Sequence, residues 1–458
     1  MEPLDTARRC ELHVHIGGCL HAEDVLRLAR HHQHDIDWHP FTSSYTEAFG
    51  ADPDPVALID AALSGDPDPW RRHFVVDAND RGDFARFQAK FNLTICVLRH
   101  LESLHRYEEA LELILDRHRR EGLEYVEYRA MYMRGTADPD GFLSFHRRNA
   151  EAIQAACGPN FEARYIPSIP RDRPLEGYAL LRRLLRQTPA LIPTVVGLDF
   201  CFFEEGHPPS SVRSFFEHLR RDNEADPTQA LAVVYHVGEV FFDKSLESAI
   251  RWCHEAAELG SVRLGHCIAL GLDPAVAVAR PLPASIGNAG SDHHRRHSGH
   301  VVEPLRERLD QIAYDLTRID ELAACGVAVD ADALTAERSH LLAADSEPPV
   351  LREYDAARLE QLRRRQQFVL DNLAATGTVI ETCPTSNLLI GAVPEPAAHP
   401  LHRFLASDVG LAVGADDPGT FASPLAAEVD WVLEHSGLTP GQLQARLGDP
   451  RRHAIVRA

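Results

Sequence analysis

Eight short apolar runs, each bounded by turn residues, recur along the chain with helical stretches between them. This rhythm is typical of a parallel sheet, whose strands are covered by helices on both faces and are therefore apolar throughout. Eight such strands predict a closed (β/α)8 TIM barrel of the α/β class. The runs are Cys10–Ile16, Tyr125–Ala130, Ala163–Ile169, Pro193–Phe200, Leu231–Val237, Val262–His266, Thr378–Cys383 and Leu411–Ala415.

Two intervals between these runs are too long for a plain strand and helix repeat. Gly17–Leu123 is expected to add several helices in the N-terminal region, and Cys267–Gly377 is expected to hold an insertion between the sixth and seventh strands. We place this insertion at about residues 277–365, inside a single hydrolase barrel that spans residues 1–458.

Within the insertion, apolar residues at steps of three and four predict an amphipathic helix over Glu303–Ala324. Leu359, Leu362, Val369 and Leu373 support a second helix. Pro281–His300 and Ala333–Val350 are rich in Pro, Gly, Ser and charge, so loops or a lid are expected there.

Composition narrows the classes of partner. Asp and Glu number 68 against 47 Lys and Arg, and the net charge of -21 argues against a nucleic acid partner, because an acidic surface repels phosphate. The 9 cysteines include no Cys-x-x-Cys pair, which predicts reduced thiols in a cytoplasmic protein. No run of about 18 apolar residues and no signal peptide is seen, so no membrane span is expected.

The first apolar run carries two histidines, in the order Glu11-Leu12-His13-Val14-His15. A spacing of two on a strand places both imidazoles on the same face of the sheet. His13 and His15 can therefore bind one metal ion.

Polar residues also follow three other runs at the point where each run ends. His236 and Glu239 follow the fifth run, His266 ends the sixth, and Asp416 with Asp417 follows the eighth. Each cluster taken alone could be a turn, but all lie at the C-terminal ends of strands, the rim where barrel active sites assemble. Three histidines and one aspartate supply ligands that Zn²⁺ accepts, and a catalytic zinc keeps one position for water.

These motifs resemble those of the adenosine deaminase family of metal-dependent amidohydrolases, in the same order along the chain. The resemblance covers the chain from the first to the eighth strand. It is carried by Glu11–His15, by His236–Glu239, by Arg263–His266, by Cys383-Pro384-Thr385-Ser386-Asn387 and by Ala415-Asp416-Asp417-Pro418 followed by Phe421.

The resemblance implies a zinc-dependent hydrolytic deaminase with one Zn²⁺ per chain. It assigns the metal to His13, His15, His236 and Asp416, and it assigns catalysis to Glu239, His266 and Asp417. The substrate would then be a small purine nucleoside or nucleotide, which loses its amino group as ammonia. The substrate-binding positions implied are Gly17, Asp199, Phe202, Ser386 and Asn387. The other class of zinc deaminase is excluded, because its Pro-Cys-x-x-Cys signature is absent.

The chain departs from the family pattern where the substrate would lie. Gly17 stands where relatives usually carry an Asp for the ribose 5′-hydroxyl, and Phe202 stands where they usually carry a Gly. Loss of that carboxylate would relieve repulsion of a phosphate, so a 5′-phosphorylated adenosine nucleotide is one candidate substrate beside adenosine. The basic cluster His293–His297 in the insertion could meet such phosphates.

Two other functions stay open at this point. The chain could catalyse another metal-assisted hydrolysis, although Glu239 favours deamination, because amide hydrolysis needs no ring nitrogen to be protonated. It could also be a ligand-binding or assembly subunit without turnover, with the insertion as its interface. The sequence is also compatible with a homo-oligomer.

Overall fold

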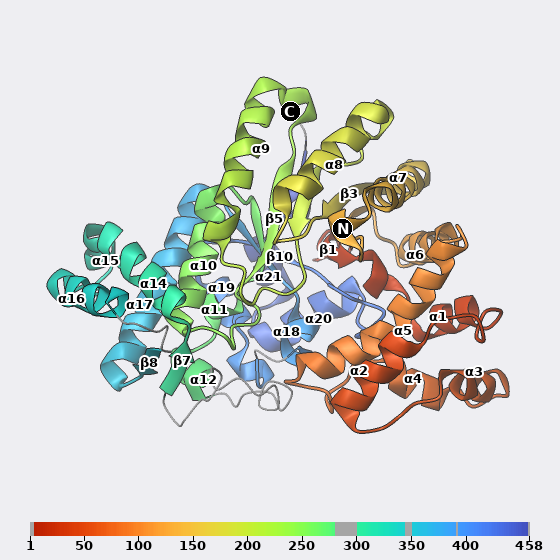
Figure 1. Ribbon diagram of the computed structural model, residues 1–458, viewed down its shortest axis with the longest axis horizontal. Coiled ribbons are helices and arrows are strands. Elements are labelled where there is room, and N and C mark those ends of the chain that lie inside the picture. The colour runs from red at the N-terminus through yellow and green to blue at the C-terminus, as the bar shows by residue number, and fades with distance from the viewer. Residues whose placement is uncertain (1–3, 280–299, 344–349, 391–392, 457–458) are drawn as a thin grey trace.

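Eight parallel strands form one sheet whose order follows the chain, in a computed structural model that describes residues 4–279, 300–343, 350–390 and 393–456. Helices surround the sheet, as Figure 1 shows, and the predicted (β/α)8 barrel is confirmed. The strands are β1 (Cys10–His15), β2 (Tyr125–Met131), β3 (Glu162–Ser168), β4 (Gly197–Phe200), β5 (Ala232–Val237), β6 (Arg263–His266), β9 (Val379–Thr382) and β10 (Gly410–Val413).

The barrel closes between β1 and the residues that follow β10. The backbone N–H of His15 donates to the carbonyl of Asp416 at 2.9 Å, and the N–H of Asp416 donates to the carbonyl of His13 at 2.9 Å. Val14 and Asp416 pair in parallel at this seam. Closure of the barrel therefore brings residues from opposite ends of the sequence side by side.

All eight predicted strands are present, and the fourth is shorter than predicted. β4 begins at Gly197, so Pro193–Val196 lies outside it. The N–H groups of Thr194 and Val195 both donate to the carbonyl of Leu191, at 3.0 and 2.9 Å. Pro193 and Thr194 therefore lie in a turn, and Val195 forms only an isolated parallel bridge with Tyr165 of β3 before β4 begins.

The N-terminal region contains the extra helices predicted between the first two strands. Figure 1 shows them together on the right of the barrel, in red and orange. The longest, α5, is capped by Asp83, whose carboxylate accepts the N–H of Ala85 at 3.0 Å. The helices are α1 (Ala22–Ala29), α2 (His39–Phe49), α3 (Pro55–Leu63), α4 (Asp68–Phe74), α5 (Phe84–Ser103) and α6 (Glu108–Arg120).

The remaining helices of the barrel follow the strands and pack their apolar faces on the sheet. In the part of the chain that the structure describes, no helix combines the length and the apolar character needed to cross a membrane. The helices that follow the strands of the barrel are α7 (Pro139–Ala156), α8 (Pro174–Gln187), α9 (Arg213–Ala225), α10 (Leu246–Leu259), α17 (Ala356–Thr376), α18 (Pro384–Leu389), α19 (Leu401–Ala406), α20 (Leu425–Ser436) and α21 (Pro440–Leu447).

In its described residues, the segment between β6 and α17 adds helices and a separate antiparallel strand pair, and no strand to the barrel. Figure 1 shows α14, α15 and α16 at the left edge, away from the N-terminal helices. The elements are α11 (Ile268–Gly271), α12 (Pro274–Ala279), β7 (His300–Glu303), α14 (Leu305–Thr317), α15 (Ile319–Ala324), α16 (Ala331–Leu342) and β8 (Val350–Glu353).

Two details predicted for this segment are wrong. The single helix predicted over Glu303–Ala324 is two helices, α14 and α15, because the backbone of Arg318 leaves the helical conformation between them. The first of the two begins only after Pro304. The loop expected from Ala333 onward is helical to Leu342, since the Asp330 carboxylate caps α16 by accepting the N–H of Ala333 at 2.9 Å. The basic cluster at residues 293–297 lies outside the described residues.

Candidate metal centre and active site

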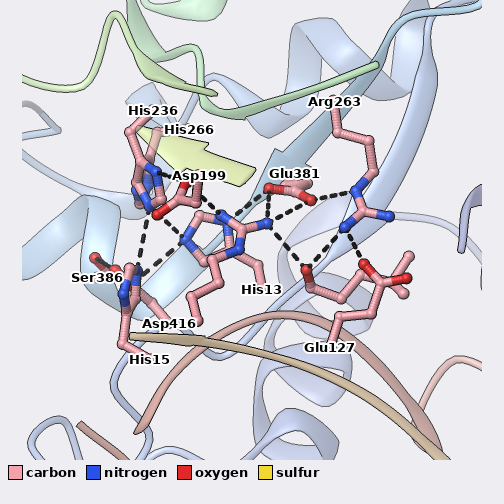
Figure 2. A network of polar contacts seen from close by, with 12 residues as sticks. His13, His15, Glu127, Asp199, His236, Arg263, His266, Glu381, Ser386 and Asp416 are labelled. Atoms are coloured by element: carbon pink, nitrogen blue, oxygen red, sulfur yellow. Dashed lines mark hydrogen bonds and ion pairs between the residues drawn. The ribbon is translucent and has the colours of Figure 1, made fainter. Parts of the chain in front are cut away.

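Three imidazoles meet at the C-terminal ends of β1 and β5. The Nε2 atom of His236 lies 3.0 Å from Nε2 of His13 and 3.2 Å from Nε2 of His15. The Nδ1 atom of His13 contacts Glu381 at 2.9 Å, and Nδ1 of His236 contacts Asp199 at 3.0 Å, as Figure 2 shows.

The carboxylates fix which nitrogen of each ring carries the proton. Burial acts to raise the pKa of Glu381, but contacts with Arg129 and Arg263 hold this pKa well below its ordinary range. An ionised carboxylate only accepts hydrogen bonds, so Nδ1 of His13 carries the proton, and the same holds for His236 beside Asp199. The Nε2 lone pairs of the two rings therefore face each other at 3.0 Å, which is unfavourable unless a cation, either a metal ion or a second proton on one ring, lies between them.

Asp416 completes the set of four predicted ligands. Its Oδ1 atom lies 3.3 Å from Nε2 of His15 and 3.6 Å from Nε2 of His13, while Oδ2 accepts a hydrogen bond from Ser386 at 2.6 Å. A tetrahedral zinc with Zn–N bonds of about 2.0–2.1 Å holds its ligand atoms about 3.3–3.4 Å apart. Burial lowers the pKa of His15 to about 4 and lowers that of His236 well below its ordinary value, so both rings are neutral at pH 7, as metal binding requires. The donor set and spacing fit Zn²⁺.

A buried network of charged side chains contacts His13 through its Nδ1 atom, on the side of the ring away from the other predicted ligands. The Glu381 carboxylate on β9 accepts hydrogen bonds from Arg129 at 2.6 and 2.7 Å and from Arg263 at 2.5 Å. Arg263 also pairs with Glu127, and all four side chains are buried (Figure 2). Sequence reasoning missed the roles of Glu381 and Arg129, although a charged residue inside an apolar strand was a visible signal.

Replacing Glu381 with glutamine should lower the free energy of unfolding by about 3–5 kcal/mol, because two buried guanidinium groups lose their shared counter-charge. Urea unfolding followed by circular dichroism, with a chelator in every sample, measures this loss apart from metal affinity. The matched control is Glu124→Gln, since Glu124 pairs with Arg9 on the surface, where an ion pair contributes about 0–1 kcal/mol. Equal stability of the two variants would contradict the role of this network.

Glu239 faces the metal ligands from the loop after β5. The N–H groups of Gly238 and Glu239 donate to the two carboxylate oxygens of Glu204, at 3.0 and 3.2 Å. Gly238 has φ of 68°, and a Cβ there would lie 2.6 Å from Sγ of Cys253, so this position requires glycine. Glu204 was missed from the sequence, because its role depends on backbone contacts between two loops.

The Glu239 carboxyl is held as a proton donor. Its Oε1 atom is buried and has no hydrogen-bond partner among the described residues. Burial, together with the charges of Asp416 and Glu204, raises the pKa of Glu239 well above its ordinary value. The surroundings of Glu239 therefore favour its protonated form, which can donate a proton to a bound molecule.

His266 and Asp417 also line this site, and Nε2 of His266 lies 3.6 Å from Oε2 of Glu239. Nδ1 of His266 contacts Oδ1 of Asn387 at 2.9 Å, and because the amide oxygen accepts, Nε2 of His266 is left as the proton acceptor. Asp417 is buried, and its Oδ1 atom has no hydrogen-bond partner among the described residues. A Cβ on Gly18 would lie 1.8 Å from this Oδ1 atom, so a glycine at position 18 makes room for Asp417.

The five predicted substrate positions divide into two groups. Gly17 and Phe202 line the cavity beside the ligands. The side chains of Asp199, Ser386 and Asn387 contact His236, Asp416 and His266, and so support the metal and catalytic groups. Phe202 is 51% exposed and has φ of 70°, a conformation that favours glycine, so it stands at the mouth of the cavity and not in the core.

The cavity has a volume of about 190 Å³ and reaches the metal ligands. His15, His236, Glu239, His266, Asp416 and Asp417 line one part of it. Helix α5 contributes a long stripe of the remaining wall, so the N-terminal helices shape the space in which a substrate would lie.

Comparison with known proteins decides the family. The sequence model described as adenosine deaminase matches residues 65–279 and 350–449. The chain belongs to the adenosine deaminase family. The family match is interrupted between residues 279 and 350, which includes β7, α14, α15 and α16.

This adenosine deaminase family chain matches curated relatives over short stretches. It is 36% identical over 77 residues to the adenine deaminase of Rhizobium leguminosarum bv. trifolii, which covers 17% of this chain and 24% of that protein. It is 40% identical over 75 residues to a putative adenosine/adenine deaminase of Streptomyces coelicolor, which covers 16% of this chain and 22% of that protein. The chain thus spans less than a quarter of the length of these relatives.

Solved structures match over nearly the whole chain. An adenine deaminase from Arthrobacter aurescens has a TM-score of 0.53 at 16% identity and covers 98% of this chain and 94% of its own. An N6-methyl-AMP deaminase from Arabidopsis thaliana has a TM-score of 0.53 at 13% identity, with coverages of 98% and 93%. An amidohydrolase from Burkholderia ambifaria with bound Zn has a TM-score of 0.51 at 15% identity, with coverages of 98% and 86%. At these identities the shared property is the fold.

Proposed function

We propose that this adenosine deaminase family member is a zinc-dependent hydrolase that deaminates an aminopurine, giving the inosine-type product and ammonia. The observation that carries the proposal is the pair of imidazole lone pairs facing each other at 3.0 Å, beside Glu239, whose buried Oε1 atom has no hydrogen-bond partner among the described residues. The first feature calls for a cation, and the second calls for a substrate atom that takes a proton.

His13, His15, His236 and Asp416 would hold one Zn²⁺ per chain. When bound, zinc supplies a water whose pKa is lowered toward about 7, so that it becomes a nucleophile at neutral pH. The zinc bound in the Burkholderia ambifaria structure supports this choice of metal.

The protein residues then move protons. Water attacks the ring carbon that bears the amino group, and Glu239 donates its proton to the adjacent ring nitrogen as electron density moves onto it. His266 and Asp417 orient the attacking water and accept its proton. The amino group then takes the proton that His266 and Asp417 accepted from water and leaves as ammonia, while the hydroxyl on the tetrahedral carbon returns a proton to Glu239 as it becomes the carbonyl.

We propose adenosine, or an adenosine derivative such as a 5′-phosphorylated nucleotide, as the substrate. Gly17 lines the cavity without a carboxylate that would repel a phosphate. The relatives named adenine and adenosine/adenine deaminase support the purine, and an Arabidopsis structural neighbour has been solved with GMP and with IMP. We further propose a cytoplasmic protein without a nucleic acid partner, which its free cysteines and net charge of -21 support.

A substrate panel tests this function. The purified chain loaded with zinc should release ammonia from at least one of adenine, adenosine, AMP and ATP, with the ultraviolet shift of the purine ring as a second readout. A clear preference for adenosine over AMP and ATP would contradict the phosphorylated substrate alone. Lack of deamination across the panel, at full zinc occupancy, would contradict the deaminase.

A further inference from the structure

The substrate cavity follows helix α5 for most of its length. Its lining residues on α5 recur at steps of three and four, so they form one stripe on the helix. At a rise of about 1.5 Å per residue, the stripe extends about 27 Å along the axis, far longer than a purine ring. The stripe comprises Phe84, Phe87, Gln88, Phe91, Ile95, Leu98, Arg99 and Glu102.

The metal ligands lie opposite the middle of this stripe. A Cβ on Gly17, two residues after His15, would lie 3.3 Å from Cζ of Phe91 and 3.9 Å from Cδ1 of Leu98. Beyond Leu98 the cavity continues to Glu102 and to Tyr107 and Phe145, whose ring centroids lie 5.2 Å apart. A purine ring whose amino group lies beside the predicted metal ligands therefore leaves this far end of the cavity unfilled.

The far end carries polar groups that no described residue satisfies. Tyr107 is only 4% exposed, and its hydroxyl has no hydrogen-bond partner in the described part of the chain. The side chains of Arg99 and Glu102 lie near it without a hydrogen bond or ion pair to a described residue, and Arg99 is exposed while Glu102 is half-buried. A polar group removed from bulk water is costly without a partner, so the Tyr107 hydroxyl points to a ligand, and Arg99 and Glu102 stand beside the place where that ligand would end.

We propose that Arg99, Glu102 and Tyr107 form a distal subsite that binds the end of a long substituent on the aminopurine. This rests on the proposed deaminase function and names its substrate class. The substituent has an apolar or aromatic stem, which packs against Phe91 and Leu98, and an uncharged terminus such as a hydroxyl.

The chemistry of the distal subsite selects this terminus. A hydroxyl accepts a hydrogen bond from Arg99 or Tyr107 and donates one to the Glu102 carboxylate, so each group gains a partner. A 5′-phosphate, in contrast, could pair with Arg99 but not with Glu102, and it would leave the apolar wall uncovered. A ribose alone is too short to pass both Phe91 and Leu98, whereas an aromatic ether on its 5′ carbon extends in that direction.

The test compares four compounds with the zinc-loaded, full-length chain. They are adenine, adenosine, AMP, and adenosine that carries a 4-(hydroxymethyl)benzyl ether on its 5′ oxygen. We expect kcat/KM for the benzyl ether to exceed that for adenosine by at least about tenfold. Higher kcat/KM for AMP than for the ether, or equal values for the ether and adenosine, would overturn the proposal.

Two variants assign the effect to the distal subsite. Tyr107→Phe and Glu102→Gln should each lower the ratio of kcat/KM for the ether to kcat/KM for adenine by about fivefold, since the first loses a hydrogen bond and the second replaces a charged acceptor with a weaker, neutral one. Glu112→Gln, on an exposed face of α6, is the matched control and should leave the ratio unchanged. An unchanged ratio in both variants would also overturn the proposal, and thermal unfolding checks that each variant is folded.

Failure of the subsite and failure of the function are distinguishable. If adenine or adenosine is deaminated while the ether has no advantage, the distal subsite is refuted and the deaminase stands. If none of the four compounds is deaminated, a competition assay measures binding of the ether directly. Weaker binding of the ether to Tyr107→Phe than to the wild type supports the distal subsite, and equal binding refutes it.

Discussion

Replacing Glu239 with glutamine should lower kcat by about 10²–10⁴-fold while leaving one zinc bound per chain. A positioned general acid contributes a factor of this size, and the amide cannot give up a proton. Zinc is retained because Glu239 lies beside the four ligands and is not one of them. Steady-state kinetics and metal analysis of the same sample measure both quantities.

The pH dependence gives the same prediction a second readout. Since burial and the neighbouring acidic groups raise the pKa of Glu239, the carboxyl is in its active, protonated form at neutral pH. Activity should fall as the pH rises through this pKa, and the fall should be absent from the residual activity of Glu239→Gln. Glu217→Gln, on the exposed face of α9, is the control for a change of one surface charge. Near-normal turnover by Glu239→Gln would refute its role as the acid.

Removing the metal should abolish deamination and destabilise the fold. Without a cation, the lone pairs of His13 and His236 face each other at 3.0 Å, so the ligands lose the interaction that holds them together. A metal held at about 1,000 times its dissociation constant contributes about 4 kcal/mol to folding. Thermal unfolding and ammonia release, before and after chelation and after zinc is added back, measure the two effects.

Asp416→Ala tests the same site by mutation. It should lose zinc and activity together, and added zinc should not restore them at the concentration that restores the chelated wild type. Asp408→Ala is the matched control, because Asp408 is an exposed aspartate just before β10, whereas Asp416 follows the same strand. Full activity in the chelated wild type, or zinc retained at full occupancy by Asp416→Ala, would refute the metal centre.

Local patterns were sufficient to predict the barrel and the candidate ligands. Each strand is a short apolar run, and a spacing of two is enough to place His13 and His15 on one face of a strand. His236 and Asp416 were then predicted as ligands, because parallel strands of a barrel end at one rim. Only adjacent residues and a general rule of topology were needed for these predictions.

Partners that are distant in sequence required the tertiary structure. Glu381 on β9 binds His13, Arg129 and Arg263, which lie on three other strands, and no local pattern specifies such a meeting. Glu204 holds the Glu239 loop through backbone N–H groups, which every residue except proline has. The stripe on α5 reads in the sequence as an ordinary amphipathic face, and only its position over the rim makes it the wall of the cavity. The sequence thus determined which chemical groups are available, whereas packing between distant elements decided how they are oriented and what space they enclose.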